Sequence, residues 1–117
     1  MGSRYFFTAA MDIPNDKEEL FNEVYDTEHI PYLSEVAGVI SIARFTTQPL
    51  RMIMGGEERE IIIENQPKHT AIYEVESPEV LLSSDWSKAV DKGRWATEVR
   101  HHTFNRRHVL LKETTSE

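Results

Sequence analysis

Residues 4–12 are apolar on both sides of a predicted strand. With a period of two, one face carries Tyr5, Phe7, Ala9 and Met11, and the other carries Phe6, Thr8 and Ala10. A strand with one solvated face would alternate apolar with polar residues. The pattern therefore predicts a strand that is covered on both faces.

Helical spacing follows this strand. Asn15 is a suitable N-cap, and the acidic residues of the next turn suit the positive end of the helix dipole. A stripe at helical spacing then contains Leu20, Phe21, Val24 and Glu28, bordered by Tyr25, His29 and Tyr32. Pro31 cannot donate to the carbonyl four residues before it. We therefore expect a kink or break near residue 30, a short second turn and an end at Gly38.

Three further strands are predicted over residues 39–47, 69–76 and 102–112. Ser77-Pro78 combines a cap with proline at the first helical position, which predicts a helix to about residue 93 with a break near residue 83. Residues 48–68 contain turn signals, among them Gly55-Gly56, and an apolar run at 60–64. They form either a mobile insertion or a hairpin over the domain edge, and we favour the hairpin.

The order of these elements is strand, helix, strand, strand, helix, strand. It predicts an α+β fold with an antiparallel sheet, the split βαβ or ferredoxin-like arrangement, in a single domain over residues 1–117. Two helices cover only one face of such a sheet, whereas residues 4–12 need cover on both. A second copy of the chain, packed sheet against sheet, is the simplest cover, so we expect a homodimer.

The chain resembles the dimeric α+β barrel superfamily, in particular its EthD-like members, in which a helix with an E-H-x-P-type segment runs into a glycine and a strand. The resemblance rests on Tyr25-Asp26-Thr27-Glu28-His29-Ile30-Pro31-Tyr32 and Gly38-Val39-Ile40-Ser41-Ile42-Ala43-Arg44-Phe45, and it covers about residues 4–112. It implies dimerisation through the sheets and a small pocket between sheet and helices. Members include cofactor-independent monooxygenases, polyketide cyclases, lactone isomerases and haem enzymes, so the fold is better specified than the chemistry.

Composition narrows the function classes. The formal charge is −7, which disfavours binding to a nucleic-acid backbone, and no apolar run is long enough to cross a bilayer. The chain has no cysteine and no signal-peptide pattern, and we expect a cytoplasmic protein. A basic cluster over residues 100–108 either balances nearby acids or forms a subsite for an anionic ligand.

His29 is the first candidate for chemistry. Its position near a helix end, with Asp26 and Glu28 close in sequence, favours its protonated form and predicts that one of the two carboxylates holds the imidazole. Such a group exchanges protons with an acidic carbon or a phenol. The alternative is that His29 only hydrogen-bonds the carbonyls freed by Pro31.

Aromatic residues extend the candidate site. Tyr25 and Tyr32 lie four residues before and three after His29, so all three can share a side of the helix. His69 and Tyr73 share a strand face, as do Tyr5 and Phe7. That face looks either towards the helices or towards the partner, and the sequence does not choose. Trp86 and Trp95 are interpreted as packing residues.

Motifs for bound cofactors are missing from the sequence. No metal-binding histidine spacing, P-loop, dinucleotide fingerprint or nucleophile elbow occurs. Haem stays open as an alternative, because some members of the superfamily use an axial histidine, but no histidine is singled out here. We expect a cofactor-free protein without a bound metal.

Two hypotheses follow. The first is a cofactor-independent homodimeric enzyme of monooxygenase, cyclase or isomerase type, acting on a small apolar, aromatic or polyketide-like compound. His29 is its acid/base, and Tyr25 and Tyr73 orient the substrate. The second is a non-catalytic homodimer that binds a hydrophobic metabolite. A cavity reached by His29 and a tyrosine favours the first, and a closed core around His29 favours the second.

Overall fold

The computed structural model describes residues 3–115. Its main sheet has four strands in the order β2-β5-β1-β6, and a separate sheet pairs β3 with β4. All neighbouring strands are antiparallel. The strands are β1 (Tyr5–Asp12), β2 (Val39–Thr46), β3 (Leu50–Met54), β4 (Glu57–Ile61), β5 (His69–Val75) and β6 (Phe104–Lys112).

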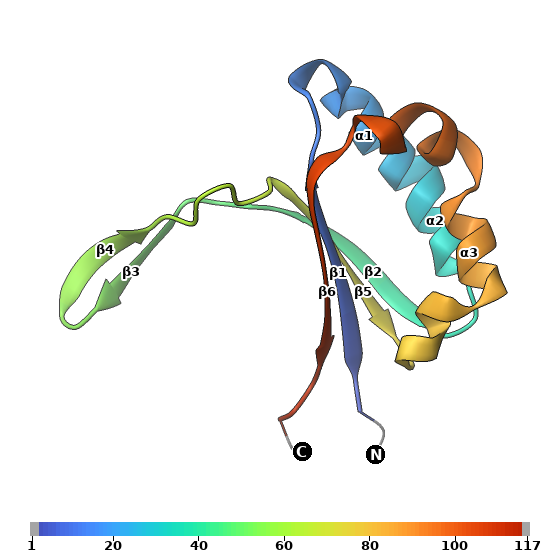
Figure 1. Cartoon of the computed structure of the whole chain (residues 1–117). Helices are drawn as coiled ribbons and strands as arrows, with labels where there is room; N and C mark the ends of the chain where they lie inside the picture. The colour runs from blue at the N-terminus through green and yellow to red at the C-terminus, as the bar shows by residue number, and fades with distance from the viewer. Residues whose placement is uncertain (1–2, 116–117) are drawn as a thin grey trace.

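The helical elements cover one face of the main sheet (Figure 1). In chain order they are η1 (Asn15–Lys17), α1 (Glu18–Val24), the π turn η2 (Tyr25–His29), α2 (Ile30–Ser34), η3 (Pro78–Leu82), α3 (Ser84–Val90), the π turn η4 (Trp95–Val99) and η5 (Arg100–His102). The arrangement confirms the predicted α+β fold class with a ferredoxin-like antiparallel sheet. None of the helices in residues 3–115 is both long and apolar enough to cross a membrane.

The strand register decides which sheet face meets the helices. Phe7 of β1 lies opposite Tyr73 of β5 and opposite Leu110 of β6. Phe7 and Tyr73 pack against the helical layer, where the buried core also holds Ala9, Met11, Phe21, Val24, Leu33, Trp95 and Val99. The outer face carries the alternate residues, among them Phe6, Ile72 and Leu111. The sequence left open whether the face with Phe7 and Tyr73 looks towards the helices or towards a partner. In the structure it looks towards the helices.

We predicted that Pro31 would kink or break the helix near residue 30, but Pro31 does not interrupt the helix. The helical path runs on from α1 through η2 to α2, and Pro31 occupies the first turn of α2, where its missing N–H does no harm. The irregularity lies just before the proline. In η2 the N–H of Ile30 donates to the carbonyl of Tyr25, five residues back instead of four.

The second helical region ends close to the predicted residue 93, and a further helical segment follows it. The expected break is at Ser83, whose hydroxyl accepts a hydrogen bond from the N–H of Trp86 and caps α3. After α3 the chain turns at residues 91–92 and Gly93, whose φ is positive, and becomes helical again in η4 and η5, so the closing strand begins at Phe104 and not at residue 102. His101 and His102 therefore lie in a 3₁₀ turn with ring centroids 4.0 Å apart, and not on opposite faces of a strand.

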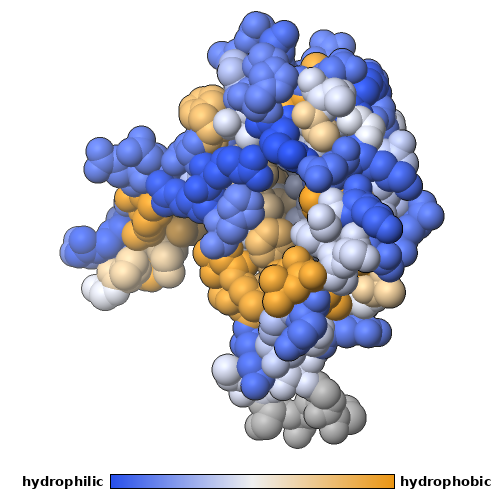
Figure 2. Space-filling view, turned by 45° about the vertical axis from the view of Figure 1, so that its right-hand side comes forward, coloured by the Kyte–Doolittle hydropathy of each residue, from blue (hydrophilic) through white to orange (hydrophobic). Residues whose placement is uncertain are grey.

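Strands β3 and β4 form a hairpin that projects from the sheet on the side away from the helices (Figure 1). Gly55 and Gly56 make its turn with positive φ angles of 61° and 83°, as a two-residue hairpin loop requires. The hairpin extends away from the body instead of lying over its edge, and its second strand spans residues 57–61 instead of 60–64. Hydrophobic surface is visible on this hairpin and over part of the body (Figure 2).

Candidate functional site

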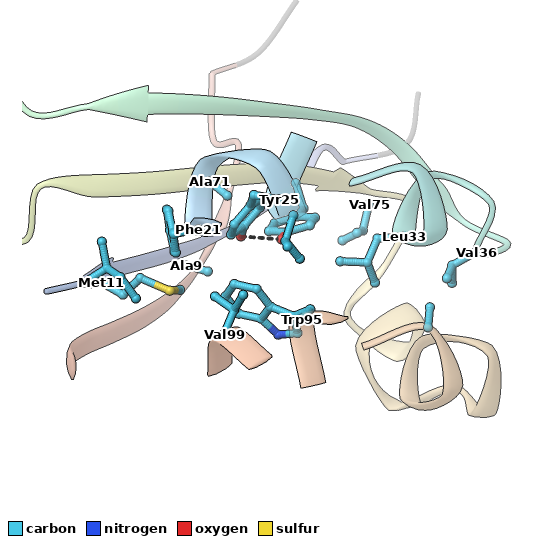
Figure 3. Packing of buried hydrophobic residues seen from close by; sticks show 14 of the residues in the cluster. Ala9, Met11, Phe21, Tyr25, Leu33, Val36, Ala71, Val75, Trp95 and Val99 are labelled. Carbon is cyan, nitrogen blue, oxygen red and sulfur yellow. Dashed lines mark hydrogen bonds between the residues drawn. The ribbon is translucent and has the colours of Figure 1, made fainter. Parts of the chain in front are cut away.

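The two π turns place aromatic rings at the centre of the helical layer. Tyr25 and His29 are the first and last residues of η2, and their rings meet edge to face with centroids 4.9 Å apart. Trp95 opens η4 and stacks on the His29 ring, with centroids 4.3 Å apart and planes 22° from parallel. Only 4% of His29 and 3% of Trp95 are exposed. The imidazole is therefore packed against two rings that also contact each other, since the centroids of Tyr25 and Trp95 are 5.1 Å apart. Figure 3 shows Trp95 and Val99 facing Tyr25 across the core.

A hydrogen bond between two tyrosines joins this layer to the sheet. The hydroxyls of Tyr25 and Tyr73 are 2.8 Å apart, and both side chains are buried (the dashed line in Figure 3). Burial raises the pKa of Tyr25, and it raises the pKa of Tyr73 well above its ordinary value, with the neighbouring Tyr25 adding to that shift. Both phenols are therefore neutral near pH 7, and each hydroxyl keeps capacity for a further hydrogen bond.

These groups line a cavity of about 320 Å³ between the sheet and the helices. His29, Tyr25 and Tyr73 form its buried end, while Arg106 and His108 of β6 are exposed. The cavity thus runs from the core to the surface. The remaining lining residues are Phe7, Ala9, Met11, Leu33, Trp86, Val90, Asp91, Trp95 and Arg100.

His29 is neutral in this setting, contrary to our prediction of a favoured protonated form. Burial is the main cause, and the charges of Arg100 and Arg106 add to it, so that the pKa falls from 6.5 to about 3. Nδ1 of His29 is buried and has no hydrogen-bond partner within residues 3–115. A neutral imidazole carries one nitrogen that accepts a proton, and the lowered pKa makes it a weak base at neutral pH.

The two carboxylates that we expected to hold the imidazole are engaged elsewhere. Asp26 is exposed and pairs with Arg44, with Oδ1 2.6 Å from the guanidinium. Glu28 accepts a hydrogen bond from the backbone N–H of Arg94 at 2.9 Å and pairs with the Arg94 side chain. That backbone hydrogen bond is the largest cause of the lowered pKa of Glu28. Glu28 therefore ties η2 to the start of η4 and does not touch His29.

Gly93 lets the chain before η4 approach Glu28 and Tyr32 closely. Its φ is +67°, and a Cβ there would lie 2.6 Å from Oε1 of Glu28 and 3.0 Å from the Tyr32 ring. Only glycine fits both the conformation and the space. The Glu28–Arg94 pair and Gly93 together hold the two π turns against each other.

The remaining predicted residues lie outside the cavity. Tyr32 contacts Lys92, whose Nζ is 5.0 Å from the ring centroid, in a separate groove between α2 and α3. His69 bonds the carboxylate of Glu18 at 2.8 Å through Nε2. Tyr5 is part-buried beside Lys112. Of the nine residues named from the sequence, the cavity brings together His29, Tyr25, Tyr73 and Phe7, and it leaves out Asp26, Glu28, Tyr32, His69 and Tyr5.

Several cavity residues were not assigned to this site from the sequence. Trp86 and Trp95 pack in or against the core, as interpreted, and both also line the cavity. Arg106 and His108 belong to the basic cluster over residues 100–108, and their alternation along β6 was the signal for the cavity, because residues two apart in a strand share a face. No cluster of three metal-binding side chains occurs between residues 3 and 115.

Comparison with known proteins identifies the fold. Neither a protein-family model nor a curated protein matches the chain. Among solved structures, the chain is similar to a protein from Shewanella loihica PV-4 provisionally identified as a monooxygenase. The TM-score is 0.52 and the sequence identity 16%, over 99% of each chain. This similarity supports the ferredoxin-like fold. The narrower EthD-like assignment stays a prediction.

Proposed function

We propose that the protein is a cofactor-independent, EthD-like enzyme in which His29 is the acid/base for a small apolar, aromatic or polyketide-like compound. One observation carries the proposal. A buried, neutral imidazole with an unbonded Nδ1 lines the same cavity as a hydrogen-bonded pair of tyrosines. A cavity of this kind was the feature that distinguishes an enzyme from a passive binding module in the sequence argument.

The proposed reaction step is removal of a proton next to a carbonyl, or from a phenol. The imidazole nitrogen of His29 takes the proton, and the electron pair moves onto the substrate oxygen as an enolate or phenolate. A hydroxyl of the Tyr25–Tyr73 pair donates a hydrogen bond to that oxygen without losing its own proton, which its raised pKa favours. The imidazolium then returns the proton to the same or a neighbouring atom.

This step is shared by the three reaction types that the fold suggests. Return of the proton to another carbon is isomerisation, and attack of the enolate on a second carbonyl is cyclisation. Reaction of the carbanion with dioxygen forms a C–O bond to a peroxide, which takes the proton from the imidazolium and, when the carbon carries a second hydrogen, loses water to leave a carbonyl. This is oxygenation, the type that the name of the Shewanella loihica protein suggests. Trp95 positions the imidazole by stacking, and Glu28 positions Trp95 through Arg94.

Exchange of carbon-bound protons with solvent tests the base directly. The probe is 1-tetralone in D₂O buffer, and proton NMR follows loss of the signal from the carbon next to its carbonyl. We expect the wild-type protein to accelerate exchange, and His29→Gln to lose about 10²-fold or more of that acceleration. The control is His101→Gln, which removes an exposed imidazole outside the cavity. Equal acceleration by His29→Gln contradicts the assignment, and binding of the probe without acceleration favours the passive binding module.

We also propose that the protein is a homodimer through the outer faces of its sheets. Phe45, Val109 and Leu111 are about half exposed on that face. The chain exposes 7749 Å², whereas a compact protein of 13.6 kDa exposes about 6,600 Å². The excess exceeds the roughly 800 Å² that each partner buries in a standard interface. The hairpin of β3 and β4 projects on the same side and would enlarge the contact (Figure 1).

A further inference from the structure

The open end of the cavity carries a positive charge that is not neutralised. Of the two arginines in the lining, Arg100 pairs with Asp91 at 2.6 Å and donates to the carbonyl of Val90. Arg106 donates to the hydroxyl of Thr103 at 3.3 Å and lies 3.4 Å from Nε2 of His108. Across residues 3–115 no carboxylate is within ion-pairing distance of Arg106. Its charge is therefore available to a ligand.

The neighbouring imidazole does not add a second charge. His108 stacks on Phe7 with ring centroids 5.7 Å apart and planes 10° from parallel. Burial and the charge of Arg106 lower the pKa of His108, so its ring is neutral near pH 7. The open end thus offers one guanidinium with its forked donors beside one neutral imidazole. This geometry suits a single planar anion better than a highly charged one.

An aromatic wall lies between this end and His29, and the paired Arg100 and Asp91 are the other charged groups of the lining. Phe7, Trp86 and Tyr73 contact one another, with ring centroids 5.4 to 5.9 Å apart. A ligand that fits has an apolar body against these rings and an anionic group outside them. A fully neutral ligand would leave the charge of Arg106 unused, and a small inorganic anion would leave the apolar walls uncovered.

We propose that the cavity takes an amphipathic monocarboxylate, with its apolar body against Phe7, Trp86 and Tyr73 and its carboxylate on the guanidinium of Arg106. The inference rests on the proposed function, because it assumes that this cavity is the ligand site. It adds the substrate class and the direction of binding. The carboxylate stays at the surface, and the opposite end of the ligand reaches His29 and the tyrosine pair.

Tryptophan fluorescence measures occupancy of this cavity specifically. The chain has two tryptophans, Trp86 and Trp95, and both line it. The probes are octanoate, its neutral analogue octanamide, octyl phosphate and inorganic phosphate, none of which absorbs where tryptophan is excited. We expect octanoate to bind wild-type protein at least about tenfold more tightly than octanamide, the preference that one charge-assisted pair supplies.

Arg106→Gln should abolish the preference for octanoate and leave the affinity for octanamide unchanged, while Arg106→Lys should retain part of it. The matched control is Arg107→Gln. Arg107 is the next residue, lies outside the cavity lining and donates to the carbonyl of Asn65. This control should keep the full preference.

Each outcome has a distinct meaning. Equal binding of octanoate and octanamide to wild type, or a preference that survives in Arg106→Gln, overturns the inference and leaves the cavity as the ligand site. Tighter binding of octyl phosphate or of inorganic phosphate overturns the choice of a carboxylate. Absence of any fluorescence response to all four probes removes the cavity as a ligand site, and the proposed function fails with it.

Discussion

Replacement of His29 by phenylalanine should make the stability of the protein less sensitive to acid. The folded chain holds His29 neutral with a pKa of about 3, whereas the unfolded chain releases this proton with an ordinary pKa near 6.5. Between these values the unfolded state binds a proton that the folded state does not. The free energy of unfolding therefore falls as the pH drops below 6.5.

The size of the effect follows from the two pKa values. At pH 5.0 the pH is 1.5 units below the pKa of His29 in the unfolded chain, and each unit corresponds to 1.36 kcal/mol. His29 should therefore lower the free energy of unfolding by about 2 kcal/mol at this pH. At pH 7.5 the cost is close to zero. Phenylalanine keeps a ring that can stack on Trp95 but does not titrate. When the pH is lowered from 7.5 to 5.0, the free energy of unfolding should thus fall by about 2 kcal/mol more in the wild-type protein than in His29→Phe.

Urea unfolding followed by circular dichroism at pH 7.5 and pH 5.0 measures the difference, at one protein concentration because a dimer is stabilised by mass action. His101→Gln is the control for loss of an exposed imidazole and should behave as wild type. Glu18, Glu28 and Glu74 have lowered pKa values, so their titration falls below this window. Equal losses in wild type and His29→Phe would show that His29 is protonated in the folded protein, and the argument for a neutral base would be wrong.

Two further predictions concern the hydroxyl pair and the outer face of the sheet. Tyr25→Phe and Tyr73→Phe should each lower the free energy of unfolding by about 1 to 2 kcal/mol. The double variant should lose about 1 kcal/mol less than the sum of the two single losses, because the same hydrogen bond is removed in all three variants. Additive losses in urea unfolding would contradict the pairing. Leu111→Glu should shift the protein from dimer to monomer in sedimentation experiments. The control is Leu82→Glu, which changes a residue of η3 that is 85% exposed and should leave the dimer intact. A monomeric wild-type protein would refute the interface.

The main strands were predictable because their signal is local. A run that is apolar on both faces marks β1, alternation with a period of two marks β5, and the Ser77-Pro78 pair marks the start of the second helical region. The closing strand was placed two residues early because residues 100–102 have no periodicity that separates a tight turn from a strand. The π turns gave no signal either, since a five-residue spacing depends on packing against the opposite helix.

The site was predictable in part for a related reason. Tyr25 and His29 were found because four residues separate them on one helix, and this spacing survives in the π turn. The roles of Asp26 and Glu28 were wrong, because sequence proximity does not include Arg44 and Arg94, which come from distant segments and pair with them. Arg106 and His108 needed the register of β6 against β1, a long-range contact that the sequence does not state.

The paired π turns make the geometry of the proposed site sensitive to the loss of one codon. Each turn holds one residue more than an α-helix needs over the same path, and Thr27 in the first turn is exposed. Loss of its codon would restore α-helical spacing over the same path, so the flanking helices could keep their places. Tyr25 and His29 would then be three residues apart, still on one side of the helix, but no longer held edge to face by the wider turn. A descendant of this chain could therefore keep the fold, the sheet and the core, and have a different geometry at the proposed site after a single deletion.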